Sequence, residues 1–140
     1  MKFPWHSDKG RAAEAVPGSS YASETVVESR AVPGVRFTIA RMSFGRRVEL
    51  MRRVRELARK TEFLAASGEA GDKMDAGLLH AEIERLYVMW GVKAVSGLAV
   101  DGSFAGPELL AEAGPEELFR EALAAVCKET GLSGEERKNS

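Results

Sequence analysis

Few residues of this chain resemble catalytic or metal-binding machinery. His80-Ala81-Glu82 matches the first half of the zinc deaminase signature, in which a histidine binds zinc and a glutamate moves protons. The second half of that signature needs two cysteines, and Cys127 is the only cysteine in the chain. We therefore interpret His80 as a surface or hydrogen-bonded residue of a helix.

Other candidate groups for chemistry have simpler explanations. His6 lies in a segment without regular pattern, so it does not complete a two-histidine metal site. Asp72 and Asp75 are three residues apart and suit a shared cation in principle, but capping of a helix explains both. Cys127 lies among small apolar residues, which predicts a buried side chain. The chain has no glycine-rich phosphate loop and no nucleophile elbow, so we expect no catalytic residue, no cofactor, no metal and no enzyme activity.

Charge is balanced overall and segregated along the chain. The net charge is −1, from 20 basic and 21 acidic residues. The stretch 36–60 carries nine basic residues and only Glu49 and Glu56 as acids, whereas the stretch from Asp101 onward carries Asp101 and eight glutamates against four basic residues. Opposite charges at the two ends predict attraction within the fold or attraction of partners.

The arginine-rich stretch is the strongest candidate for a binding surface of its own. Arg46, Arg47 and Arg53 suit contacts with phosphates or with an acidic partner. A nucleic-acid binder normally adds a positive net charge and amide side chains that read bases, but this chain has one asparagine and no glutamine. A solvated face, balanced by the acidic C-terminal helices, is the interpretation we favour, and nucleic-acid binding remains an alternative.

The composition predicts one domain with two loose ends. Residues 1–33 have no sustained period and predict a mobile N-terminal arm, or an extended peptide that docks on another surface. Residues 34–132 are predicted to form a helical domain with a small sheet, and residues 133–140 a charged tail. The N-terminus shows no signal peptide, and no stretch approaches the length of a membrane span. We expect a cytoplasmic protein that does not bind a membrane.

Two long helices are predicted in the first part of this domain. Ser43 is a plausible N-cap for a helix that runs to about Ser67, and its apolar residues form one broad face: Val48, Leu50, Met51, Val54, Leu57, Ala58, Phe63 and Leu64. A second helix begins at Asp72 or Asp75 and continues to about Ala94, with a stripe formed by Leu79, Ile83, Leu86 and Trp90. This stripe predicts a core face or a groove for a partner, with Trp90 as an anchor.

Short strands complete the predicted fold. Val35, Phe37 and Ile39 alternate with more polar residues, which is the period of a half-buried strand. Asp101-Gly102, flanked by apolar residues, is the strongest hairpin signal in the chain. Because a lone strand leaves backbone groups unpaired, we expect residues 35–41 to join the hairpin in a three-stranded sheet.

The last forty residues predict two shorter helices and an unfinished third. Pro107 and Pro115, each followed by acidic residues, suit the first turn of a helix. Gly131 suits a left-handed helix stop, and Ser133 with Glu136 has the spacing of a capping box. The predicted fold class is therefore mainly α with a small antiparallel β element (α+β): two long helices, a hairpin and two shorter C-terminal helices.

Taken together, these segments resemble the tail assembly chaperones of long-tailed bacteriophages and prophages. The resemblance covers about residues 33–140, and its motifs are Arg-Leu-Tyr-Val-Met-Trp-Gly (85–91), Val-Ser-Gly-Leu-Ala-Val-Asp-Gly (95–102), Pro-Glu-Leu-Leu (107–110), Gly-Pro-Glu-Glu-Leu (114–118) and Leu-Ser-Gly-Glu-Glu-Arg-Lys-Asn (132–139).

The resemblance implies a non-enzymatic protein of the bacterial host cytoplasm. Such a protein binds the tape measure protein and keeps that long helical chain soluble during tail tube assembly, and the tail tube protein is a second candidate partner. It also implies a longer product made by a ribosomal frameshift, and Arg137-Lys138-Asn139 permits a slippery run of codons. Under this interpretation, apolar patches of the second and C-terminal helices cover the client, with these partner-binding residues: Tyr87, Trp90, Leu109, Leu110 and Phe119. The alternatives are a nucleic-acid-binding regulator and a structural virion adaptor.

Overall fold

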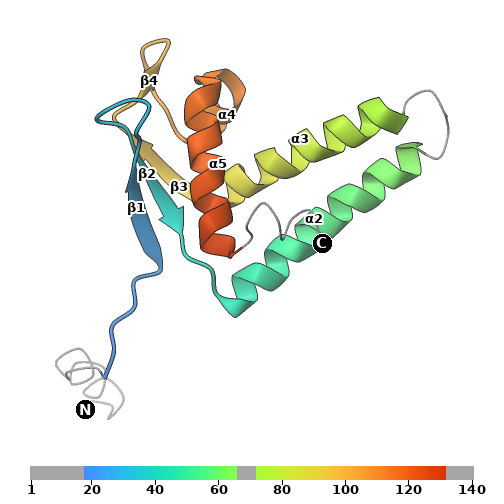
Figure 1. The fold of residues 1–140 in the computed structure, drawn as a ribbon, viewed down its shortest axis with the longest axis horizontal. Helices are drawn as coiled ribbons and strands as arrows, with labels where there is room; N and C mark the ends of the chain where they lie inside the picture. The colour runs from blue at the N-terminus through green and yellow to red at the C-terminus, as the bar shows by residue number, and fades with distance from the viewer. Residues whose placement is uncertain (1–17, 66–71, 132–140) are drawn as a thin grey trace, which may run out of the picture.

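The computed structural model describes residues 18–65 and 72–131 and has the predicted α+β architecture. In chain order its elements are β1 (Glu24–Glu28), β2 (Arg36–Ala40), α2 (Phe44–Ala65), α3 (Asp72–Gly91), β3 (Val92–Ser96), β4 (Ala99–Val100), β5 (Ser103–Phe104), α4 (Pro107–Ala113) and α5 (Glu116–Thr130). Figure 1 shows α5 beside the sheet, with α2 and α3 extending together to one side. The predicted two long helices, hairpin and two shorter C-terminal helices are all present.

The long helices begin and end close to the predicted positions. The Ser43 hydroxyl oxygen accepts a hydrogen bond from the Arg46 N–H at 3.3 Å, which is the predicted N-cap of α2. The end of α3 differs from the prediction, because the helix stops at Gly91 and not near Ala94. Val92, a β-branched residue that favours extended backbone, opens β3 directly afterwards.

The three-stranded sheet has different members from those predicted. Its order is β1-β2-β3, and both pairs are antiparallel. The strand β1 lies inside the segment 1–33. The prediction of a mobile arm is therefore wrong for residues 24–28, which instead form an extended segment docked on β2, as in the alternative. The residues Thr25, Val26 and Val27 are β-branched and favour extended backbone. The strand β1 pairs with β2 along its whole length, with Glu24 opposite Ala40 at one end and Glu28 opposite Arg36 at the other. Residues 1–17 lie outside the described residues.

The hairpin forms as predicted but stays separate from this sheet. Asp101 and Gly102 have φ values of 49° and 80°, the two consecutive left-handed residues of a tight two-residue turn. The turn pairs Ala99 with Phe104 and Val100 with Ser103 in a two-stranded unit, β4-β5. The predicted pairing of residues 35–41 with the hairpin is therefore wrong, since β3 takes that place.

The core lies between the sheet and the helices. Val35, Phe37 and Ile39 are all buried, which confirms the predicted alternation of the strand. They share one cluster with buried side chains of the helices and of β3: Val88, Val92, Leu110, Leu118, Ala122, Leu123, Val126 and Cys127. Cys127 is thus the small buried residue that the sequence predicted. Within residues 18–65 and 72–131, no helix is both long and apolar enough for a bilayer crossing.

The ends of the C-terminal helices follow their sequence signals. Pro107 is the first residue of α4, and Pro115 lies just before α5, where its missing N–H removes no helical hydrogen bond. Gly131 has φ 78° and ψ 11°, the left-handed conformation that was predicted to stop this helix. Leu132 and the predicted capping box of Ser133 and Glu136 lie outside the described residues.

A carboxylate of α5 holds the loop between β1 and β2. Glu121 accepts hydrogen bonds from the Ser29 hydroxyl, from the Arg30 N–H at 2.8 Å and from the Ala31 N–H at 3.4 Å. Burial alone would raise the pKa of Glu121, but these hydrogen bonds and the charge of Arg30 favour the ionised form and lower the pKa below its usual 4.5. The loop is thereby attached to the helix on which the sheet packs.

This attachment predicts a pH-dependent contribution to stability. Because the folded pKa is lowered, the contribution of Glu121 is complete above pH 4.5 and is lost as the pH falls through the lowered value. We expect Glu121→Gln to reduce the free energy of unfolding by about 1 kcal/mol at pH 7, and the deficit to be smaller at pH 3, below the usual pKa of 4.5. Urea unfolding at both pH values measures it, with the exposed Glu24→Gln as control. A deficit independent of pH would contradict the assignment.

Replacing either of two glycines of α3 by alanine should change the free energy of unfolding in opposite directions. A Cβ at Gly91 would lie 2.6 Å from Cγ1 of Val126, so this glycine allows α3 and α5 to approach closely. We expect Gly91→Ala to lower the free energy of unfolding by about 1–3 kcal/mol through overpacking. A Cβ at Gly77 meets open space, so Gly77→Ala should raise it by about 0.5–1 kcal/mol through helix propensity. Urea unfolding measures both variants. If both substitutions changed the free energy of unfolding in the same direction, the packing argument would be refuted.

Candidate functional site

A row of apolar side chains on α2 faces solvent. Phe44, Val48 and Met51 are spaced by four and three residues, so they lie along one side of the helix. Their exposed fractions are 85%, 47% and 64%, which are high for large apolar residues. We call these three residues the exposed row. The sequence pattern grouped Val48 and Met51 with Leu50 in one broad apolar face, and the structure divides that face, because Val48 and Met51 are exposed whereas Leu50 is buried.

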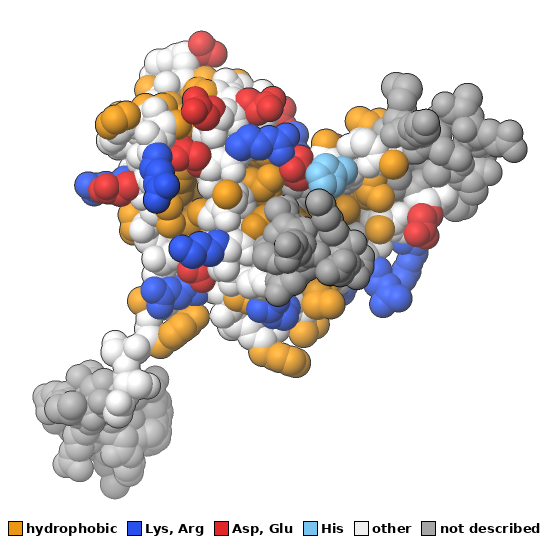
Figure 2. All heavy atoms as spheres, in the orientation of Figure 1, with side chains coloured by type: hydrophobic (Ala, Val, Ile, Leu, Met, Phe, Trp, Pro, Cys, Tyr) orange, Lys and Arg blue, Asp and Glu red, His pale blue; other side chains and the backbone are white. Residues whose placement is uncertain are grey.

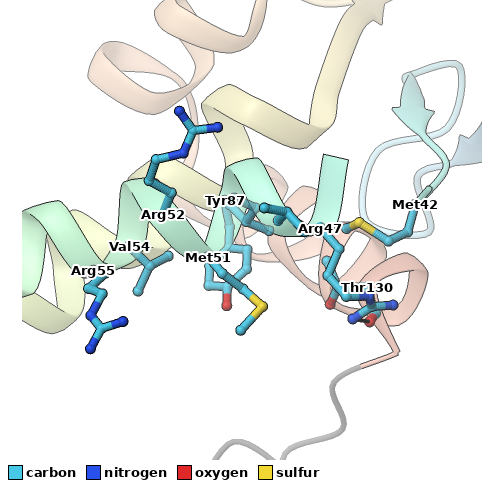
Figure 3. Close-up of a pocket in the computed structure, with 10 residues that line it drawn as sticks. Met42, Arg47, Met51, Arg52, Val54, Arg55, Tyr87 and Thr130 are labelled. Atoms are coloured by element: carbon cyan, nitrogen blue, oxygen red, sulfur yellow. Dashed lines mark hydrogen bonds between the residues drawn. The ribbon is translucent and has the colours of Figure 1, made fainter. Parts of the chain in front are cut away.

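The exposed row borders an apolar groove of about 720 Å³, here called the α2 groove. Its lining comes from α2, from the segment before it, and from α3 and α5: Met42, Arg47, Val48, Leu50, Met51, Arg52, Val54, Arg55, Tyr87 and Thr130. Figure 3 shows Met51 and Tyr87 in the middle of the groove, with Arg47 reaching towards Thr130 at one end. Because its lining is mostly apolar, the α2 groove suits apolar side chains.

The charged residues of this lining are all arginines. Arg47, Arg52 and Arg55 line the α2 groove, and no carboxylate is among its described lining residues. Figure 2 shows hydrophobic side chains along the lower edge of the molecule, where α2 begins, with basic side chains beside them. The site therefore combines an apolar floor with a positive rim.

Two consecutive arginines attach the start of α2 to the rest of the fold. The Arg46 guanidinium lies 4.2 Å from the centre of the Trp90 ring and donates a hydrogen bond to the Trp90 carbonyl at 3.3 Å. The Arg47 guanidinium donates to the Thr130 carbonyl at 2.8 Å. Both carbonyls lie in the last turn of a helix, where a positive charge is favoured by the helix dipole. Because consecutive residues point in different directions around α2, each arginine reaches a different helix, α3 or α5.

The predicted partner-binding residues do not share one surface. Tyr87 lines the α2 groove, whereas Trp90 is half-buried beneath Arg46. Leu110 is 1% exposed and belongs to the core, so its side chain is not available to a partner in this structure. Leu109 and Phe119 are half-buried on α4 and α5. Of the five, the structure places only Tyr87 in the groove.

The arginines predicted to contact phosphates or an acidic partner make contacts within the chain. Arg46 and Arg47 are engaged at the helix ends described above, and the Arg46 Nε is buried without a hydrogen-bond partner among the described residues. Arg53 pairs with Glu49 at 2.9 Å, one turn away on α2. Arg47 alone of the three lines the α2 groove.

Ion pairs among the described residues do not join the basic stretch 36–60 to the acidic C-terminal part. They instead link α3 to the C-terminal helices, through Arg85 with Glu112 and Arg120 with Glu84, and β2 to β1, through Arg36 with Glu28. The ion pairs of the described residues therefore do not show the predicted attraction between the two ends, and the contact of Arg47 with the C-terminal part is a hydrogen bond to the Thr130 carbonyl.

Residues with catalytic or metal-binding chemistry do not gather at this site. His80 is exposed on α3, with its Nε2 3.6 Å from a Glu84 carboxylate oxygen. Among the residues that the structure describes, no three His, Cys, Asp or Glu side chains are placed to hold a metal ion. The chemistry available at the α2 groove is apolar contact and electrostatic attraction.

Comparisons with known proteins give no relative: no protein-family model, no curated protein and no solved structure matches this chain.

The sequence alone did not single out the exposed row, because α2 carries a second row of apolar residues with the same spacing. Leu50, Val54 and Leu57 repeat the same four-and-three spacing, six residues after Phe44, Val48 and Met51 respectively. Leu50 is buried, and Val54 and Leu57 are half-buried, so this second row is the one that faces the fold. Two parallel rows are wider than one helix contact, and this excess width was the available signal for a further surface.

The contacts of Arg46 predict a structural role that Arg53 lacks. We expect Arg46→Ala to lower the free energy of unfolding by about 2 kcal/mol, because it removes both the ring contact and a hydrogen bond from a charged donor. Arg53→Ala, on the same helix, should cost no more than about 0.5 kcal/mol because its ion pair is exposed. Urea unfolding followed by circular dichroism checks both, and similar losses would show that the Trp90 contact contributes little.

Proposed function

We propose that this protein is a non-enzymatic chaperone that holds an amphipathic helix of another protein in the α2 groove. The exposed row carries the proposal, since three large apolar side chains beside an apolar groove are left uncovered by the described parts of the fold. Contiguous exposed apolar surface of this kind is typical of a protein interaction site.

The shape of the site suits a helix. From Phe44 to Arg55 the groove side of α2 extends for roughly 17 Å, or about three helical turns. A client helix lying alongside would place apolar residues at every third or fourth position against Val48, Met51 and Tyr87, which is the helix-in-groove mode of peptide recognition. Met51 adds a flexible side chain that adapts to different client side chains.

The client we propose is a phage tape measure protein. This part of the proposal is supported by the resemblance of residues 33–140 to tail assembly chaperones of long-tailed phages. A tape measure protein is a long helical chain that aggregates until tail tube subunits assemble around it. Covering its apolar stripe in the bacterial host cytoplasm would keep it soluble, and the groove offers a surface for that task.

The two alternatives use other features of the molecule. A nucleic-acid-binding regulator was predicted to use Arg46, Arg47 and Arg53. In the structure Arg46 and Arg47 are engaged with backbone carbonyls and Arg53 with Glu49, which makes these three less suited to phosphate contacts. A structural virion adaptor would use the same apolar surface and would stay in the particle. Mass spectrometry of purified virions distinguishes it, because an assembly chaperone leaves before the particle is complete.

Co-expression with the tape measure protein of the same phage genome tests the proposed function. We expect the chain to raise the soluble fraction of the tape measure protein several-fold and to co-purify with it. Met51→Asp should abolish both effects, because a charge in the groove must be desolvated against apolar client residues. Soluble and insoluble fractions are quantified by gel densitometry.

A matched control is available on the neighbouring helix. Leu78 on α3 is 61% exposed, similar to Met51, but it is not part of the α2 groove. Leu78→Asp should leave solubilisation unchanged, and circular dichroism should show both variants folded. If the wild-type chain does not solubilise the tape measure protein, the proposed client is wrong. If Leu78→Asp is as damaging as Met51→Asp, the groove is not the binding site.

A further inference from the structure

We propose that the helix held in the α2 groove is acidic along both sides of its apolar stripe. This inference rests on the proposed function and adds the chemical class of the client. It follows from the placement of arginines around the exposed row, and it separates this client from helices that are merely amphipathic.

Two arginines flank the exposed row symmetrically. Arg47 and Arg52 are five residues apart and therefore about 140° apart around the axis of α2, with Phe44, Val48 and Met51 near the middle of that arc. Arg55 continues the line of the row by one more turn. All three are exposed and line the groove, so a bound helix meets positive charge on each side and at one end.

The acidic residues of α2 do not cancel this charge. Glu49 and Glu56 point more than about 100° away from the exposed row, and Glu49 is paired with Arg53. Glu62 lies on the side of the row, but about two turns beyond Arg55. Thr130 brings the C-terminal end of α5 to the groove, where Arg47 already binds its carbonyl.

Two of the rim arginines have no partner in the described part of the chain. Within residues 18–65 and 72–131, the side chains of Arg52 and Arg55 make no hydrogen bond and no ion pair. Client carboxylates would therefore meet Arg52 and Arg55 without breaking a contact among the described residues. Arg47 keeps its bond to the Thr130 carbonyl and still presents exposed surface.

The same charges disfavour a second copy of the chain as occupant. Two α2 helices packed through their exposed rows would bring Arg47, Arg52 and Arg55 of one copy against those of the other. Like charges at an interface oppose association, whereas a row of client carboxylates complements the rim. The rim thus selects a different partner, and an acidic one.

Two synthetic helical peptides, each titrated into the full chain, test the charge rule, by which the α2 groove prefers a helix with acidic residues beside its apolar stripe. Both carry the same apolar residues at every third and fourth position, one with glutamates at the flanking positions and the other with lysines. We expect the glutamate peptide to bind about tenfold more tightly in isothermal titration calorimetry at low salt. Raising the salt concentration from 50 to 500 mM should reduce this preference, because exposed charges are screened.

Charge reversal on either side of α2 provides matched variants. Arg52→Glu/Arg55→Glu should invert the peptide preference in favour of lysine. Arg53→Glu/Lys60→Glu makes the same change in net charge on the opposite side of the helix, near the separate hollow that both residues line. It should leave the preference unchanged, and circular dichroism confirms that each variant is folded.

The outcomes separate this inference from the proposed function. Equal binding of both peptides would overturn the charge rule while leaving the groove as a client site. If neither peptide binds but the tape measure protein is still solubilised, the acidic client class is wrong and the proposed function stands. If neither peptide binds and the tape measure protein stays insoluble, both proposals fail.

Two other occupants of the groove would also overturn the inference. Sedimentation that shows a dimer of the wild-type chain, converted to a monomer by Met51→Asp, would assign the groove to a second copy. A tenfold gain in glutamate-peptide affinity for Glu135→Gln/Glu136→Gln would assign it to the chain's own C-terminal residues.

Discussion

The contacts of Arg46 and Arg47 with the last turns of α3 and α5 determine which side of α2 faces solvent. Each guanidinium donates a hydrogen bond to a carbonyl in the last turn of α3 or α5, where the helix itself supplies no N–H for that carbonyl. The Arg46 guanidinium also lies over the ring of Trp90. Neighbouring residues on a helix diverge by about 100°, so one pair of arginines fixes both the position and the rotation of α2. With that rotation fixed, Leu50 turns inward and Val48 and Met51 turn outward. The apolar groove and its positive rim both follow from this attachment.

This attachment also explains how an apolar surface persists in a folded protein. An exposed apolar row would be buried if α2 rotated by about a third of a turn. Such a rotation would break the Arg46 and Arg47 contacts and move Leu50 out of its buried position. The loss of two hydrogen bonds from charged donors and the exposure of Leu50 both oppose such a rotation, whereas burial of the exposed row favours it. The groove is therefore held open by the same polar contacts that dock the helix.

Local patterns predicted the elements of this fold better than their partners. The alternation of Val35, Phe37 and Ile39, the Asp101-Gly102 turn and the Ser43 cap all depend on neighbouring residues, and the structure confirms each. The sheet depends on pairing between segments far apart, since β2 at residues 36–40 joins β3 at residues 92–96. The residues of one strand and its neighbours in the sequence do not indicate which other strand it pairs with. The same limit applies to the site, because the choice between two apolar rows on α2 depends on contacts with Trp90 and Thr130 that are distant in sequence.

A groove of about three turns sets a limit on how the proposed chaperone would work. Three turns correspond to roughly eleven residues of a client helix, and a long helical client exposes its apolar stripe over many times that length. One copy would cover only a short part, so many copies would have to bind along the client. Each contact would be small, and it would be screened at the rim by salt, which favours rapid release of individual copies. Weak attachment repeated along the client would protect the whole stripe, and it would still let tail tube subunits replace the copies one at a time.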